Sequence, residues 1–207
     1  MTQPAFMQIA VWTIAAFLIG SIPFGVVVGR LFFRSDIRSS GSGNIGAANA
    51  LRSYGKLGGA AVLLLDGLKG FAPAYALLAF TPTDPAYAVW LGFVAVLGHC
   101  YSPWLGGRGG KGVATWLGAV TAISWPVALG FVLLWLAIVI PTRWASLGSL
   151  TATACSAIAL GVVRHDPWTA LVSGAAAAVI FVKHRENIGR LVAGRENKIG
   201  FGKASRA

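Results

Sequence analysis

Long apolar blocks separated by short polar segments make up most of this sequence. A helix that crosses a bilayer needs roughly 20 apolar residues in a row, with a range of about 17–25. The clear candidates for such helices are residues 4–33, 60–80, 86–105, 145–163 and 168–182. The pattern therefore predicts an all-α integral membrane protein.

A sixth apolar block, residues 113–140, is too long for one ordinary crossing and short for two. The tripeptide Ser124-Trp125-Pro126 interrupts this block. Proline is favoured in the first turn of a helix, so a new helix can begin here. A break at the tripeptide gives two short helices and seven crossings in total, whereas an unbroken block gives six.

The distribution of basic residues favours seven crossings, because cytoplasmic segments of membrane proteins carry an excess of Lys and Arg. With seven crossings, one side of the membrane holds nearly every basic residue, and the other side keeps only Arg164. The segments on the basic side are residues 34–59, 105–112, 141–145 and 183–207. We therefore predict one polytopic membrane domain over residues 1–207. It would be a bundle of seven transmembrane helices, two of them short, with the N-terminus outside and the C-terminus in the cytoplasm.

Composition agrees with a membrane protein and excludes several other classes. Of the 207 residues, 56% are hydrophobic and 11% are charged, against about 25% charged residues in soluble proteins. The net charge of +11 is explained by the positive-inside pattern, so we expect no nucleic-acid partner. No Lys or Arg precedes Arg30, which is unlike a cleaved signal peptide. Cys100 and Cys155 form no metal-binding or disulfide pattern, and we expect neither a metal nor a cofactor.

The first of three polar segments on the cytoplasmic side is rich in glycine and serine. Closely spaced glycines allow backbone N–H groups to converge on an anion, and an arginine can bind phosphate with two parallel hydrogen bonds. A helix that starts near Ala47 would direct its N-terminus at the same place. The alternative is a flexible loop. The candidate residues are Gly41, Ser42, Gly43, Asn44, Gly46, Asn49 and Arg52.

The second segment, residues 106–112, contains five glycines, one arginine and one lysine. Its chemistry is that of a phosphate-binding loop, although its spacing and context are not those of a Walker A motif. An ordinary positive-inside loop is the alternative, but topology alone does not require so many glycines. The candidate residues are Gly109, Gly110, Lys111 and Gly112.

The third segment, residues 183–191, continues to Gly194, Glu196 and Lys198. A basic stop-transfer tail accounts for its Lys and Arg residues. It does not account for His184, Glu186 and Asn187 together, which makes these three residues candidates for a site.

Asp66 and Lys69 lie within an apolar block, three residues apart on one helix. Such a pair lowers the cost of burying either charge. A structural ion pair is at least as good an interpretation of this feature as a functional site.

The three polar segments together predict a site for a phosphorylated small molecule at the inner membrane surface. At these residues the chain resembles the bacterial acyl-phosphate:glycerol-3-phosphate acyltransferases (PlsY-type), a family of small multi-span enzymes. The resemblance covers nearly the whole chain. It is carried by residues 20–25, 41–52, 66–70, 98–99, 109–115, 184–188 and 198–200. The chain departs from the family at Ala48, where threonine is usual, and at Gly107-Arg108, where an aromatic residue followed by a basic one is expected.

The resemblance implies transfer of a fatty acyl group from acyl phosphate to the 1-hydroxyl of glycerol 3-phosphate, at the bacterial inner membrane. The product, lysophosphatidic acid, would enter phospholipid synthesis. The partners would be these two small molecules and membrane lipid; the oligomeric state is left open. The residues implied as catalytic are Ser42, Arg52, Lys111, His184 and Asn187. The residues implied as substrate-binding are Gly41, Gly43, Asn44, Gly46, Asn49, Gly109, Gly110, Gly112 and Glu186.

Acyl phosphate is already activated, so no covalent enzyme nucleophile is required. Either His184 or the substrate's own phosphate, with a second pKa near about 6, could accept the hydroxyl proton. We expect substrate assistance, with His184 and Asn187 as hydrogen-bonding positioners. The rival interpretation of the whole chain is a small transporter or channel for a phosphate-like anion. A purely structural membrane protein would leave the motifs unexplained.

Overall fold

The structure, a computed structural model, describes residues 3–81 and 85–200. Over these residues the chain is helical and contains no strand, which confirms the all-α prediction. The helices are α1 (Gln3–Ser21), α2 (Phe24–Phe33), η1 (Ile37–Ser39), α3 (Ala47–Phe80), α4 (Ala86–Cys100), η2 (Pro103–Leu105), α5 (Val113–Ile123), α6 (Trp125–Thr142), α7 (Ala145–Arg164), α8 (Pro167–Lys183) and α9 (Arg185–Val192), where η marks a 3₁₀ helix.

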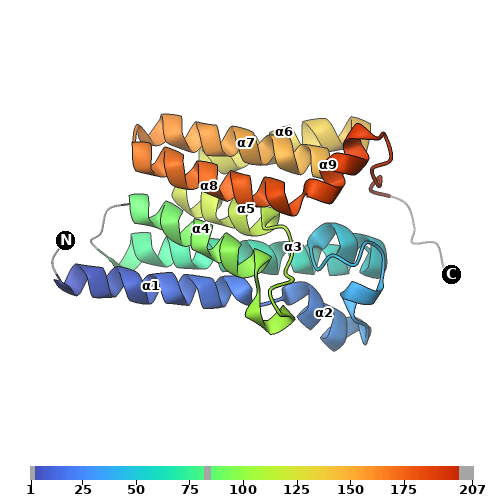
Figure 1. The fold of residues 1–207 in the computed structure, drawn as a ribbon, viewed down its shortest axis with the longest axis horizontal. Coiled ribbons are helices and arrows are strands. Elements are labelled where there is room, and N and C mark those ends of the chain that lie inside the picture. The colour runs from blue at the N-terminus through green and yellow to red at the C-terminus, as the bar shows by residue number, and fades with distance from the viewer. Residues whose placement is uncertain (1–2, 82–84, 201–207) are drawn as a thin grey trace.

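The long helices run side by side along the long axis of the molecule (Figure 1). Helix α1 begins at one end of the bundle. Helix α2, the first part of α3 and helix α9 gather toward the other end (Figure 1). The polar segments that are far apart in the sequence therefore meet at one end of the bundle.

Four helices are long and apolar enough to cross a membrane: α3, the α4–η2 stretch, α6 and α7. A fifth crossing is added if the bent pair α1–α2 counts as one span, and α5 and α8 are shorter apolar helices. Large apolar side chains on α6, including Leu129, Leu133 and Ile140, are exposed on the outside of the bundle. A surface of this kind suits a lipid environment, since water-soluble monomers rarely expose extended apolar patches.

The predicted break in residues 113–140 is confirmed. Helix α5 ends at Ile123 and α6 begins at Trp125, with the backbone at Ser124 extended and Pro126 in the first turn. Proline lacks the N–H that a continuing helix would need, whereas the first turn of a helix leaves N–H groups unpaired anyway.

Two predicted boundaries differ in the structure. The first apolar block is broken between Ser21 and Phe24, and its two parts are bent by 41°, because Pro23 cannot donate the backbone hydrogen bond that would continue α1. The helix expected to start near Ala47 does begin there, which ends the predicted loop over residues 34–59 at that residue. Gly55 is non-helical, with a φ of 74° that glycine tolerates, and the two helical stretches of α3 meet there at a kink.

Close packing of small residues joins α3 to α5. A Cβ atom on Gly118 would collide with the carbonyl of Gly67, and one on Gly70 would collide with the carbonyl of Thr115. Such close approach of two backbones is typical of membrane helix pairs. It holds the start of α5, and the glycine-rich loop before it, against the face of α3 that carries Asp66.

Candidate active site

An inner cavity of about 400 Å³ lies between α3, α5, α6, α7 and the C-terminal segment. One part of its wall is polar and includes residues from all three motifs. The polar lining residues are Ser42, Asn44, Asn49, Arg52, Asp66, His99, Lys111, Ser146, Ser149, His184, Asn187, Arg190, Glu196 and Asn197. The other part is apolar, and its larger residues are Leu63, Val113, Leu117, Phe131, Val132, Trp135 and Leu136.

An outer cavity of about 790 Å³ adjoins the inner one, and it is lined by Arg38, Arg108, Glu186 and neighbouring loop residues. The two cavities share five lining residues: Ser42, Asn44, Lys111, Arg190 and Asn197. The junction therefore has two cationic side chains, which suits the passage or binding of an anion.

Asn49 organises the first motif. Its side chain is buried, and the two N–H groups of its amide are shared among the backbone carbonyls of Ile37, Ser40 and Asn44, which lie 2.9–3.1 Å from Nδ2. Its Oδ1 accepts from the N–H of Ser42 at 2.8 Å, and Arg52 donates to Ser42 Oγ at 3.1 Å. One buried amide thus folds the loop so that the Ser42 hydroxyl and the Arg52 guanidinium face the cavities together.

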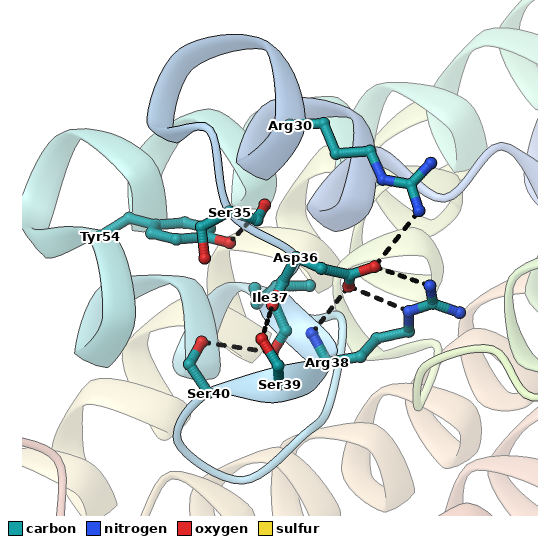
Figure 2. A network of polar contacts seen from close by, with 8 residues as sticks. All are labelled: Arg30, Ser35, Asp36, Ile37, Arg38, Ser39, Ser40 and Tyr54. Carbon is teal, nitrogen blue, oxygen red and sulfur yellow. Dashed lines mark hydrogen bonds and ion pairs between the residues drawn. The ribbon is translucent and has the colours of Figure 1, made fainter.

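A second network fixes the entry to this loop (Figure 2). Asp36 accepts from the Arg38 side chain at 2.6 Å and 2.9 Å, and from Arg30 at 3.3 Å. The hydrogen bonds from Arg38 hold the pKa of the Asp36 carboxyl well below its usual range. On the other side of the segment, Tyr54 donates to the carbonyl of Ser35 at 3.2 Å. The carboxylate therefore orients two arginines close to the outer cavity.

The glycine-rich loop is packed against the end of α4. The N–H of Gly110 donates to the carbonyl of His99 at 3.1 Å, so this N–H is already used within the protein. Gly112 has a φ of 84°, and a Cβ there would crowd Val96. Between these two glycines, Lys111 extends its ammonium group to Asn187 Oδ1.

Burial sets the protonation of the titratable groups here. Burial, together with the nearby Arg190, lowers the pKa of Lys111 to about 8. Burial is also the main reason that the pKa of His184 falls to about 4, and the Lys111 charge acts in the same direction. The His184 Nδ1 atom lies 2.8 Å from the carbonyl of Ile180. A carbonyl can only accept, so the proton sits on Nδ1 and Nε2 is a free acceptor.

The C-terminal segment supplies a carboxylate that sequence analysis did not place in the site. Glu196 accepts from Asn187 at 2.6 Å, from Arg190 at 2.8 Å and from Ser146 at 2.9 Å. Burial alone would raise the pKa of Glu196, but these hydrogen bonds more than offset it and hold the pKa below its usual value. Glu196 therefore orients Asn187, which in turn accepts from Lys111.

The structure brings most of the predicted site residues to the two cavities. Those at the inner cavity are Ser42, Asn44, Gly46, Asn49, Arg52, Lys111, Gly112, His184 and Asn187. Gly43, Gly109 and Glu186 line only the outer cavity, and Gly41 and Gly110 line neither. Gly41 packs against the Asn49 side chain, and Gly110 packs against His99. These two glycines therefore allow their loops to pack closely against the protein and do not line a cavity themselves.

Four ionisable residues at the inner cavity were absent from the predicted set: Asp66, His99, Arg190 and Glu196. Arg190 and Glu196 lie within or just after the third motif, so their position in the sequence was a usable signal. The approach of His99 to the glycine-rich loop depends on the turn after α4, which residue spacing does not reveal.

The fold and the site define a multi-pass membrane protein with a cavity that is cationic at one part and apolar at another. A model of the glycerol-3-phosphate acyltransferase family matches residues 10–194. Glycerol-3-phosphate acyltransferase of Mesorhizobium japonicum is 47% identical over 89% of this chain and 92% of its own length. That of Roseobacter denitrificans is 42% identical over 97% of this chain and 98% of its own length.

Two solved structures agree with the sequence relatives. The crystal structure of PlsY (YgiH), an integral membrane glycerol 3-phosphate acyltransferase, in its glycerol 3-phosphate form has a TM-score of 0.86 and 42% identity, and the match covers 93% of this chain and 96% of that one. The lysophosphatidic acid form has a TM-score of 0.84 and 41% identity, with the same coverage. The protein belongs to the glycerol-3-phosphate acyltransferase family.

Proposed function

We propose that this protein transfers a fatty acyl group from acyl phosphate to the 1-hydroxyl of glycerol 3-phosphate and releases lysophosphatidic acid and inorganic phosphate. Family membership supports the acceptor and the product. The relatives' names do not state the donor. Acyl phosphate is our proposal; it suits a site with several cations, and as an already activated donor it requires no covalent enzyme nucleophile.

The inner cavity is the observation that carries this proposal. Its polar wall holds Arg52, Lys111 and Arg190, which can neutralise two phosphate groups. Its apolar wall, with Phe131 and Trp135, can take the start of an acyl chain. An anion transporter would require the cationic wall but not the apolar wall. The same cavity therefore fits an acyl transfer site better than an anion pathway.

In the proposed reaction, the glycerol 1-hydroxyl oxygen forms a bond to the acyl carbonyl carbon. The bond from that carbon to the bridging phosphate oxygen breaks, and phosphate leaves with the electron pair. Arg52 and Lys111 reduce the repulsion between the two anionic substrates and stabilise the charge that develops on the leaving group. Ser42 and Asn187 supply hydrogen bonds that hold the reacting groups in place.

The hydroxyl proton passes to a substrate phosphate. A phosphate monoester with a second pKa near about 6 is a stronger base than an imidazole whose pKa is about 4. His184 Nε2 remains an acceptor in the cavity, which suits a positioner of the acceptor hydroxyl. Glu196 accepts from Asn187, which in turn accepts from Lys111, so these two residues hold the ammonium group in place.

We also propose seven crossings, an outside N-terminus and a cytoplasmic site in the bacterial inner membrane. The bent pair α1–α2, the four long spans and the shorter α5 and α8 together give seven. An odd number is supported by the positions of α1 and α9, since the chain starts α1 at one end of the bundle and reaches α9 at the other (Figure 1). The basic residues of the motifs at the α9 end support a cytoplasmic orientation.

The function is tested with purified protein in detergent, without any ion or substrate gradient. Acyl phosphate and glycerol 3-phosphate should give lysophosphatidic acid and inorganic phosphate in equal amounts, and acyl-CoA should not replace acyl phosphate. Arg52→Ala is the matched inactive control. Efficient turnover with acyl-CoA would refute the proposed donor, and no turnover with either donor would refute acyl transfer itself.

A further inference from the structure

Three ionisable side chains are buried inside the bundle beside the inner cavity. Asp66, Lys69 and His99 are 1%, 2% and 3% exposed. Lys69 Nζ lies 2.7 Å from Asp66 Oδ1. An ion pair this deeply buried is often no more stable than a well-packed apolar pair, because both charges lose their solvation. Ionisable residues within membrane helices usually serve a function, and the contacts of these three residues indicate one.

Lys69 connects this group to the break between α1 and α2. Its Nζ donates to the carbonyl of Ile22 at 2.8 Å, and it lies 5.6 Å from the centre of the Phe24 ring. The same carbonyl also accepts from the N–H of Phe24 at 3.1 Å, so the Lys69 ammonium is a second donor to a backbone group at the helix break. Lys69 is therefore held in place by two partners, Asp66 on its own helix and the carbonyl of Ile22 in the break between α1 and α2.

His99 connects the group to the glycine-rich loop. Its Nδ1 lies 3.6 Å from Asp66 Oδ1, and its carbonyl accepts from the N–H of Gly110 at 3.1 Å. A Cβ atom on Gly110 would meet the His99 ring, with Nε2 nearest, and one on Gly109 would meet the His99 carbonyl oxygen. The loop thus lies directly on the ring and on the backbone of one residue.

The position of this loop determines the position of Lys111. Gly110 and Lys111 are adjacent in the chain, with Cα atoms about 3.8 Å apart across a trans peptide bond, so a displacement of Gly110 also shifts the backbone of Lys111. Lys111 donates to Asn187 on α9, and both residues line the inner cavity, so a shift of the Lys111 backbone would strain this hydrogen bond. A misplacement of about 1 Å at a reacting centre can cost roughly 10²-fold in rate.

We propose that His99, buried beside the Asp66–Lys69 ion pair, is a positioning residue for the reaction. The His99 ring and carbonyl fix the distance of Gly109 and Gly110 from the end of α4, and this position aligns Lys111 with Asn187. This inference rests on the proposed function, because its readout is the rate of acyl transfer.

The test uses Gly110→Ala with and without His99→Asn. Gly110 is outside the left-handed region of the backbone, and the three atoms nearest to an added methyl group are all in the His99 ring. Asparagine keeps an amide group at the place of Nδ1 and removes Nε2. Gly110→Ala alone should lower kcat/KM for glycerol 3-phosphate tenfold or more, His99→Asn alone should lower it a few-fold, and the double variant should recover to the His99→Asn level.

Gly109→Ala is the matched control. Its methyl group would meet the His99 carbonyl oxygen, which every residue carries, so His99→Asn should not rescue it. Recovery of both glycine variants, or losses that multiply in the Gly110 double variant, would overturn the proposal. Wild-type protein without turnover would instead refute the proposed function, so the two failures are distinguishable.

Folding is followed by the melting temperature in detergent, and the position of Lys111 by the basic limb of the pH–rate profile. Gly110→Ala should shift that limb, and the double variant should restore it. If Gly110→Ala alone does not fold, His99→Asn should restore both the melting transition and kcat/KM. A stable Gly110→Ala protein with lower activity and an unshifted limb would count against a positioning role.

Discussion

Lys111 lies where the inner and outer cavities meet, and its ammonium group donates to Asn187. Burial and the charge of Arg190 lower its pKa to about 8. The side chain is therefore charged at neutral pH and loses its charge as the pH rises through the weakly alkaline range. An anionic substrate would favour the charged form and raise this pKa on binding.

This pKa predicts the alkaline side of the pH–rate profile. The kcat/KM for glycerol 3-phosphate should fall as the pH rises through about 8, since kcat/KM reports the free enzyme. The corresponding limb in kcat should lie at higher pH, because bound phosphate stabilises the ammonium. Lys111→Arg keeps its charge to much higher pH, so that variant should be slower but should lack the limb. If the alkaline limb persists in Lys111→Arg, it reports the titration of another group and not of Lys111.

His184 gives a second prediction at the residue scale. Its pKa of about 4 leaves the ring neutral over the working range and makes it a weak base. His184→Gln retains a hydrogen-bonding group in the cavity, so we expect appreciable residual activity and an unchanged acidic limb. A true general base typically contributes about 10²–10⁴-fold. A loss beyond about a thousandfold, together with disappearance of the acidic limb, would make His184 the base.

At the scale of elements, the segment after α9 closes one side of the site. Gly194, with a φ of 66°, turns the chain back after α9. Ile199 then exchanges hydrogen bonds with Arg143 between α6 and α7: its N–H donates to the Arg143 carbonyl at 2.8 Å, and its carbonyl accepts from Arg143 Nε at 2.9 Å. These contacts fix the short stretch between them, which contains Glu196.

The two glutamates of this region should therefore differ in importance. Glu196→Gln removes a charge that accepts from Asn187, Arg190 and Ser146. Losing a charge-assisted bond of this kind costs roughly 1.5–3 kcal/mol, or about ten- to a hundredfold in kcat/KM. Glu186 is exposed and lines only the outer cavity, so Glu186→Gln should cost less. Steady-state kinetics give kcat/KM for both variants. A larger loss of kcat/KM for Glu186→Gln would contradict this ranking and indicate that Glu186 acts at the reacting centre.

The same region explains what the sequence can and cannot predict. The break at Ser124 was predictable because a proline leaves a local signature in any apolar block. The convergence of three glycine-rich or basic segments followed from topology. The contact between Glu196 and Asn187 was not predictable, because it requires the reversal of the chain at Gly194. The contact of His99 with Gly110 likewise depends on a turn whose path is set by tertiary packing.

At the scale of the whole molecule, the bundle separates polar and apolar functions along its axis. The motif-bearing ends of α2, α3 and α9 lie together (Figure 1), while exposed leucines and isoleucines cover helices such as α6. A water-soluble substrate can therefore reach the cavity from one end, and a lipid-like donor can approach from the side of the bundle. This arrangement requires that the basic end face the compartment that contains glycerol 3-phosphate.

Orientation in the membrane is therefore the last prediction, and it is independent of activity. Helix α7 ends at the end of the bundle away from α9 (Figure 1), and His165 is the next residue in the chain. Arg195 lies three residues after α9, and both His165 and Arg195 are exposed. In a background without Cys100 and Cys155, His165→Cys should react with a membrane-impermeant thiol reagent in intact spheroplasts. Arg195→Cys should react only after the membrane is opened, because seven crossings put the two positions on opposite sides. Reaction of both cysteines in intact spheroplasts, or of neither, would exclude this topology. The reverse pattern would keep the crossings and invert the protein, which would place its site away from the cytoplasm.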